Sequence, residues 1–420
     1  MAESNSRTVL IRPGLVADGL GGSARAGESV FVRNGRIAAV GPAEAVATEV
    51  PPGTEAVDLP GCCLTPGLID GHTHLSLPGD GRPYRETFGE SDETMALIGA
   101  MNLRRHLDAG ITTLREHGAR NRVGFTLKEG LRQGYIPGPR MLVSGRPITC
   151  IGGHFHMCNE IADGEEEIRR SVRRLVHEGA DYIKVMASGG GTAGTIPGLA
   201  TYSTRELRAL VGEARQFHRL TAAHCRAKES MVRAVEAGID LIEHVEFLDP
   251  DHQMRFDPKV AEMLAESGVW LSPTLQAWTN YPSMVQLRRR REQGALGARE
   301  EARLAHLEQR AEKRIDLMRR MLDYCLKERI VPGTDSGVGG LEFGHLDYDL
   351  QLLVACGFTP GEALVSATRT SAEAAGIADE VGTIEAGKAA DLAAFGGDPT
   401  EDVAAFSDVR AVFQAGVRVR

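Results

Sequence analysis

The chain has 420 residues, of which 42% are hydrophobic and 25% are charged, so it can bury a large core and is not a disordered protein. Its formal net charge of −9 argues against nucleic acid or an anionic membrane as a partner, because a polyanion is normally met by a clustered basic surface. The one basic run, residues 288–291, is followed by many acids in a helical stretch, which favours a solvated or inter-subunit helix.

Cysteine usage and the N-terminal stretch predict a cytoplasmic protein. The 7 cysteines are odd in number and scattered, unlike a disulfide framework. Residues 1–7 are polar without a basic start, and no apolar run is long enough to span a bilayer. We therefore expect a soluble protein in a reducing compartment, with neither secretion nor membrane insertion.

Short strands joined by tight turns are predicted for residues 1–63. Asn34 and Gly35 separate two of these strands, and this dipeptide predicts a two-residue hairpin because both central positions of that turn need a positive φ. The strand-like runs are residues 8–11, 29–33, 36–40 and 55–59.

Beyond residue 63 the pattern changes to apolar runs that alternate with amphipathic helices, which is typical of repeated β/α units. Eight runs over about 270 positions fit a (β/α)₈ TIM barrel, which usually takes roughly 250 residues. A doubly wound open sheet is the alternative, but no glycine-rich phosphate fingerprint follows the first run. The runs are residues 64–74, 112–117, 140–144, 182–187, 221–225, 241–245, 270–274 and 331–335.

Strand-like runs return at residues 391–395 and 409–414, after the predicted barrel domain of residues 64–378. The simplest arrangement is a small β-sandwich domain built from both chain ends, residues 1–63 and 379–420. A long, charged helical insertion at residues 283–328 elaborates the seventh β/α connection, where it is a lid, an oligomer contact or a plain solvated helix.

Histidine, lysine and aspartate side chains stand at the predicted carboxyl ends of the strands. His72 and His74 lie two apart in an extended run, so both imidazoles face the same way and can bind one cation. This pair is a weak signal alone, but the carboxyl ends of barrel strands carry the chemistry, and a buried lysine or aspartate is costly unless paired or bound to metal. The further candidates at such ends are Lys184, His224, His244 and Asp335.

Two longer motifs carry a family resemblance. Residues 66–74 read PGLIDGHTH, and residues 382–392 read GTIEAGKAADL. With these motifs the chain resembles, over nearly its whole length, the amidohydrolase superfamily, in particular its two-metal members with a carboxylated lysine on the fourth strand.

The resemblance implies a site for two divalent metal ions, Zn²⁺ first, with manganese, cobalt or iron also compatible with nitrogen and oxygen ligands. An ammonium has no lone pair for a metal, so Lys184 would have to carry a CO₂-derived carbamate. A shared water would become hydroxide near neutral pH, and Asp335 would take its proton during attack on a carbonyl and return it to the leaving amine. The implied ligands are His72, His74 and Asp335 for one ion, His224 and His244 for the other, and Lys184 for both.

Within the superfamily the chain looks most like the prolidases, Xaa-Arg carboxypeptidases and ochratoxin-hydrolysing amidases, which release an amino acid with a free carboxylate. By this resemblance His154 would donate a hydrogen bond to the scissile carbonyl or its oxyanion. Arg226 or Tyr202 would bind the substrate carboxylate. The alternative for each is an ordinary loop or surface residue, and His117 and His156 give weaker signals.

We therefore expect a metal-dependent enzyme that acts on a small-molecule amide or dipeptide, and a homo-oligomer as is common in this group. A cyclic amidase that opens imidazolone, dihydropyrimidine or hydantoin rings is the alternative, because such enzymes keep the lysine that deaminases generally lack. A non-catalytic scaffold protein would have lost ligands, whereas all the implied ligands are present.

Overall fold

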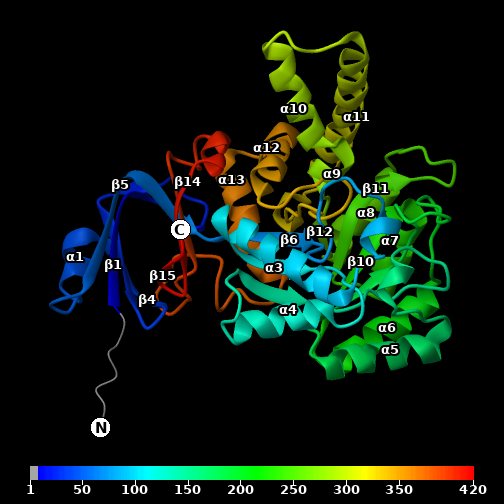
Figure 1. Ribbon diagram of the computed structural model, residues 1–420, viewed down its shortest axis with the longest axis horizontal. Coiled ribbons are helices and arrows are strands. Elements are labelled where there is room, and N and C mark those ends of the chain that lie inside the picture. Colours follow the sequence, from blue (N-terminus) through cyan, green and yellow to red (C-terminus); the bar gives the residue numbers. More distant parts are fainter. Residues whose placement is uncertain (1–7) are drawn as a thin grey trace.

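The computed structural model describes residues 8–420, and the polar segment 1–7 lies outside the described residues. Strands from both chain ends lie together on one side of the molecule, next to a larger body in which strands and helices alternate (Figure 1). The candidate site lies in the larger body.

Both chain ends contribute to one mixed sheet with the order β15-β14-β13-β5-β1-β3-β4, and β2 pairs with β1. β1 and β5 are parallel, and β13 continues the sheet antiparallel to β5, so the last strands of the chain extend the first ones. The strands are β1 (Thr8–Val16), β2 (Arg25–Ala26), β3 (Glu28–Arg33), β4 (Arg36–Pro42), β5 (Glu55–Pro66), β13 (Leu392–Phe395), β14 (Val409–Gln414) and β15 (Val417–Arg418).

The predicted hairpin is confirmed, because Asn34 and Gly35 connect β3 and β4 with φ values of 52° and 78°. Ile11, Leu64 and Phe413, from three distant parts of the chain, pack in one apolar cluster of this sheet. All of these strands belong to a single sheet, so a division into two packed layers remains a prediction. The predicted boundary after residue 63 falls inside β5.

The larger body contains two parallel sheets, with the orders β6-β7-β8 and β12-β11-β10-β9. Isolated parallel bridges connect them: Ile148 pairs with Val185 on one side, and the segment 330–336 pairs with Leu271 and Thr73 on the other. The run expected as the eighth strand is thus an extended segment held by bridges. The regular strands are β6 (Leu68–Thr73), β7 (Ile111–Glu116), β8 (Arg140–Val143), β9 (Tyr182–Met186), β10 (Leu220–Ala227), β11 (Leu241–Leu248) and β12 (Trp270–Ser272).

Helices follow most of these strands, and local capping sets several of their ends. Ser203 and Glu206 form a capping box at the start of α6, and Gly238 ends α7 in the left-handed conformation. No helix within residues 8–420 is both long and apolar enough to cross a membrane. The α-helices outside the insertion are α1 (Ala43–Ala47), α2 (Tyr84–Thr87), α3 (Asp92–Asp108), α4 (Val123–Arg132), α5 (Gly164–Glu178), α6 (Thr204–Gln216), α7 (Lys228–Ala237), α8 (Pro258–Ser267), α12 (Leu346–Cys356), α13 (Pro360–Val365) and α14 (Ser371–Ala374).

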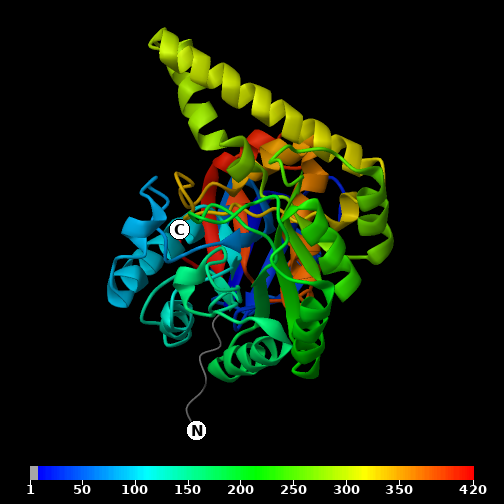
Figure 2. The same ribbon diagram turned by 90° about the vertical axis from the view of Figure 1, so that its right-hand side faces the viewer.

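The predicted insertion is helical and consists of α9 (Leu275–Thr279), α10 (Tyr281–Glu292) and α11 (Ala298–Leu322). α10 and the start of α11 project from the body as a helical pair (Figures 1 and 2). Leu287 and Leu304 pack in the small apolar cluster between the two helices. Within the basic run, Arg288 pairs with Glu308 of α11, which gives this charge a local partner.

Candidate metal centre and active site

The predicted metal ligands come together in the larger body. His72, His74 and Asp335 stand at or just beyond the ends of their extended segments, Lys184, His224 and His244 lie inside β9, β10 and β11, and none of these residues is more than 4% exposed. The sequence therefore predicted their convergence, although they are separated by up to 263 positions, from 72 to 335. The ligands are His72 in β6 and His74 just after it, Lys184 in β9, His224 in β10, His244 in β11, and Asp335 in the segment 330–336.

His72, His74 and Asp335 form one compact group. The Nε2 atoms of the two histidines lie 3.3 Å apart, and each of these atoms lies 3.4 Å from Oδ1 of Asp335. Two imidazoles and one carboxylate at such separations match the nitrogen and oxygen ligands of a divalent cation.

The remaining two histidines adjoin this group. The rings of His224 and His244 have centroids 4.4 Å apart, and the centroid of His244 lies 5.0 Å from that of His72. Nδ1 of His244 lies 2.8 Å from the hydroxyl oxygen of Thr274, which fixes the orientation of the ring.

Lys184 is fully buried, and its Nζ atom has no hydrogen-bond partner among residues 8–420. The nearest acid is Glu243, whose Oε1 lies 4.0 Å from Nζ. Burial lowers the pKa of Lys184 to about 8, against the opposing effect of Glu243 and Asp335. A buried amine without a partner costs free energy, so this position calls for a modification or a ligand.

Glu243 is a site residue that the sequence interpretation missed. Its Oε2 lies 2.8 Å from Nδ1 of His72, and its Oε1 lies 3.2 Å from Nε2 of His117. Burial would raise the pKa of this carboxyl group, but His72 and Lys184 lower it more, and the net shift is downward. Its position immediately before His244 in β11 was the only signal in the sequence.

A carboxylate at Nδ1 leaves the lone pair of a histidine on Nε2. In His72 this Nε2 atom faces His74 and Asp335. His117 and Glu243 also stand close enough to His72 to hold an ion as a separate group of three. Because Nδ1 of His72 already bonds to Glu243, and Nε2 of His117 donates to the carbonyl of Gly71 at 2.7 Å, we assign Glu243 and His117 a supporting role.

Asp70 connects β6 to the segment that carries Asp335. Its carboxylate accepts hydrogen bonds from the backbone N–H of His72 at 3.1 Å and from the backbone N–H of Thr334 at 3.0 Å. Asp335 itself has a φ of 55°, a strained value for a residue other than glycine. The side chain that is expected to move protons is therefore held in place by its neighbours.

Burial favours the neutral form of three imidazoles at the site. It lowers the pKa values of His154, His224 and His244 well below the usual value of 6.5, and nearby positive charges lower them further. Neutral imidazoles are the form that binds metal ions.

His154 lies beside the metal-ligand cluster. Its ring centroid is 4.6 Å from that of His224, and its Nδ1 atom is 2.8 Å from the hydroxyl oxygen of Thr192. The backbone N–H of Thr192 also points at Nδ1 over 3.4 Å, which assigns the proton of the ring to Nε2. A Cβ atom on Gly190 would lie 2.4 Å from Nε2, so only glycine leaves this nitrogen room.

The two residues predicted to bind a substrate carboxylate differ in their surroundings. Arg226 pairs with Glu246, and its guanidinium lies 4.0 Å from the ring centroid of Trp278. Tyr202 is buried at 1% exposure, and its hydroxyl donates to the carbonyl of Ala162 at 2.8 Å. The geometry therefore gives no support to a substrate role for Tyr202.

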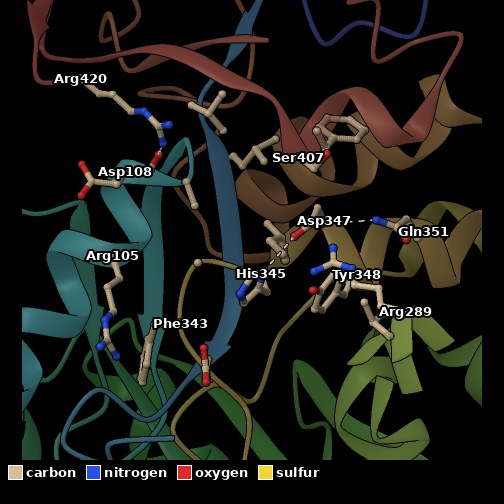
Figure 3. A pocket seen from close by; sticks show the side chains of 18 residues that line it. Arg105, Asp108, Arg289, Phe343, His345, Asp347, Tyr348, Gln351, Ser407 and Arg420 are labelled. Atoms are coloured by element: carbon tan, nitrogen blue, oxygen red, sulfur yellow. Dashed lines mark hydrogen bonds and ion pairs between the residues drawn. The ribbon is translucent and has the colours of Figure 1, made fainter. Parts of the chain in front are cut away.

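A surface cavity of about 560 Å³ lies away from this cluster (Figure 3). Arg105, Arg289 and His345 line it together with acidic residues, and none of the predicted site residues does. It is therefore not the candidate reaction site, because the candidate metal ligands lie elsewhere.

The family assignment agrees with this site. Residues 63–419 match the model of the amidohydrolase family. The chain belongs to the amidohydrolase family.

Individual relatives are more distant. Ochratoxinase of Aspergillus niger is 27% identical over 381 residues, which cover 83% of this chain and 73% of that protein. Imidazolonepropionase of Agrobacterium fabrum is 24% identical over 413 residues, which cover 93% of this chain and 88% of that protein. A solved structure of a Xaa-Pro dipeptidase with bound methionine superposes with a TM-score of 0.81 at 24% identity, over 98% of this chain and 99% of that one. The family match indicates a hydrolase acting on C–N bonds, and the structural similarity shows a TIM-barrel-type α/β fold.

Proposed function

We propose that the protein is a two-metal amidohydrolase that cleaves an amide and releases a C-terminal amino acid from a dipeptide or an N-acyl amino acid, aryl amides of the ochratoxin type included. One observation carries the proposal: the buried Nζ of Lys184, which has no hydrogen-bond partner in the described part of the chain, lies near the cluster of four histidines and Asp335. The proposed metal ligands are those that the sequence predicted.

The donor set fits two cations only if Lys184 is modified. Its neutral amine nitrogen would form a bond to the carbon of CO₂ with release of one proton, and the resulting carbamate would offer two oxygens where an ammonium offers none. The lowered pKa of Lys184, about 8, favours the neutral amine that this reaction needs. His72, His74 and Asp335 would hold one ion, His224 and His244 the other, with Lys184 between them and Zn²⁺ as the first choice.

Bound divalent ions would supply Lewis acidity and lower the pKa of a water molecule. Asp335 would take the proton of the attacking water as the oxygen bonds to the carbonyl carbon, and would return it to the leaving nitrogen as the C–N bond breaks. His154 would donate its Nε2–H to the oxyanion, since Nδ1 is occupied by Thr192.

Arg226 would bind the carboxylate of the leaving amino acid through the part of its guanidinium that Glu246 does not use. Stacking on Trp278 holds the guanidinium in place. We leave Tyr202 out of the proposal, because its hydroxyl is bonded to Ala162.

A cyclic amidase is the second candidate, and the similarity to imidazolonepropionase favours it. The substrate panel that separates the two contains N-acyl amino acids, their C-terminal carboxamides, dipeptides, hydantoins, dihydropyrimidines and imidazolones. We expect hydrolysis of the free-carboxylate substrates and a higher KM for the carboxamides. Turnover of the ring substrates alone would overturn the first candidate.

An Arg226→Gln variant refines this test. We expect it to raise KM for the carboxylate substrate while leaving KM for the matched carboxamide unchanged, because only the first loses an ion pair. The exposed pair Arg132 and Glu129 offers a control, Arg132→Gln, which should change neither value.

The remaining expectations stay part of the proposal. We propose a small-molecule substrate, no nucleic-acid or membrane partner, a cytoplasmic location and a homo-oligomer. Light scattering of the purified chain at several concentrations tests the oligomer, and a mass equal to one chain throughout would exclude it.

A further inference from the structure

Arg314 of α11 lies fully inside the protein, with 1% of its surface exposed. Its guanidinium donates to three backbone carbonyls, two inside β11 and one just after β12. Nη1 donates to the carbonyl of Val245 at 2.7 Å, and Nη2 donates to those of His244 and Pro273, the latter at 3.1 Å.

These carbonyls lie just beyond the point where β11 and β12 stop pairing. β12 pairs with β11 only as far as Glu243, so beyond this residue β11 has no strand neighbour on that side within residues 8–420. His244 and Val245 also have φ values of 71° and 49°, which are strained for side chains with a Cβ atom. Buried carbonyls need donors, and the planar guanidinium supplies several in one fork.

The imidazole ring of His244 is held by the connection between β12 and α9. Thr274, just after β12, bonds to Nδ1 of His244 at 2.8 Å. Trp278 of α9 donates to the hydroxyl of Thr274 at 2.9 Å. His244 is thus fixed at its backbone by α11 and at its ring by the residues that lead into α9.

The burial of Arg314 is hard to explain by packing alone. A buried cation without a carboxylate bonded to it costs free energy, and an apolar side chain would fill the same space at less cost. The described contacts of its guanidinium are all backbone oxygens. We therefore attribute the burial of Arg314 to the backbone conformation that its hydrogen bonds stabilise.

We propose that Arg314 is a positioning residue for the metal ion assigned to His224 and His244, so that the helical insertion is part of the metal centre and not only a solvated or subunit-contacting arm. This inference rests on the proposed function. Arg314 acts through the backbone of His244, which sets the direction of the imidazole, and touches neither ion nor substrate.

The test is a titration of the metal-stripped full-length chain with Co²⁺ alone, followed by visible absorption, together with thermal unfolding of the same samples. The wild type should bind two equivalents. Arg314→Gln should weaken one of them by about tenfold to a hundredfold and leave the other unchanged, which is the usual cost of losing a group that orients a ligand. Arg303→Gln, an exposed position on the same helix, should behave like the wild type.

A purely structural role predicts a different result, namely that both equivalents weaken together as Tm falls. That result, or wild-type binding of both equivalents by Arg314→Gln, would overturn the inference. If Arg314→Gln does not fold, Arg314→Lys replaces it, since lysine keeps the charge but not the planar fork. Its prediction is the same selective loss, and unaltered binding of both equivalents overturns the inference equally.

The two proposals fail in distinguishable ways. A wild type that binds fewer than two equivalents contradicts the two-metal function, and the Arg314 inference with it. A wild type and Arg314 variants that all bind two equivalents with equal affinity contradict the Arg314 inference alone.

Discussion

The Glu243 carboxylate lies 2.8 Å from Nδ1 of His72, and both side chains are buried. This hydrogen bond fixes the ring and directs Nε2 toward His74 and Asp335. Carboxylates in this position make histidine ligands more basic and hold them ready for a metal ion. Glu243 also stands nearest to Lys184, and it therefore links the two halves of the candidate centre.

Glu243→Gln should weaken metal binding without unfolding the protein. Glutamine has nearly the same shape but lacks the charge, so we expect affinity for Zn²⁺ to fall by about tenfold to a hundredfold. Metal content after dialysis against a weak chelator measures this loss. Glu129→Gln, at an exposed position, is the control, and an unchanged metal content in Glu243→Gln would remove the supporting role.

Lys184→Ala should abolish activity and reduce metal content, because no other residue is proposed to join the two ions. Bicarbonate or a short carboxylic acid added at millimolar concentration should restore part of the activity by supplying the missing oxygens. Lys259→Ala, at an exposed position of α8, should have no effect. Full activity of Lys184→Ala without additives would contradict the assignment.

Asp335→Asn should fold normally and lose turnover by orders of magnitude, since an amide cannot take up the proton of the attacking water. Asparagine also tolerates the positive φ of 55° at this position. Steady-state kcat at saturating substrate is the measurement, with circular dichroism as the check on folding. A kcat equal to that of the wild type would remove Asp335 as the proton carrier.

The metal-free protein should lose stability as the pH falls through 6.5. An unfolded histidine takes up a proton near pH 6.5, whereas burial holds the pKa values of His154, His224 and His244 well below that value. The unfolded state then binds more protons, so the free energy of unfolding decreases, by about 1.4 kcal/mol for each unit by which a folded pKa is lowered.

Urea unfolding between pH 7.5 and 5.5 measures this dependence. His154→Gln should reduce the slope of stability against pH, because one neutral buried imidazole is gone. His306→Gln, at an exposed position of α11, should leave the slope unchanged. A stability that stays constant over this range would contradict the buried neutral state of these rings.

The sequence predicted the strands that carry the ligands, because each lies in an apolar run and its polar residue stands near the carboxyl end. It could not predict that residues 331–335 would be held by isolated bridges and not by a regular strand, since hydrophobicity does not report hydrogen-bond geometry. The single sheet formed by the two chain ends could not be predicted for the same reason. Apolar runs in a sequence indicate where strands lie, but the hydrogen-bond pairing between strands decides how many sheets they form.

The supporting residues were harder to predict than the ligands. Glu243 and Asp70 act through contacts across strands, and Arg314 reaches β11 from a helix 70 positions further along the chain. A buried acid or arginine in a sequence looks like any other charged residue until its partners are known. The hydrogen bond of Tyr202 to Ala162, which gives its predicted substrate role no support, is likewise a tertiary contact that the sequence does not reveal.

Diffraction from a crystal of the metal-loaded protein, measured at the zinc absorption edge, tests the central claim most directly. We expect two anomalous peaks in the cluster, one beside His72, His74 and Asp335 and one beside His224 and His244, with extra density on Nζ of Lys184 between them. An unmodified Lys184 that points away from any ion would contradict the account.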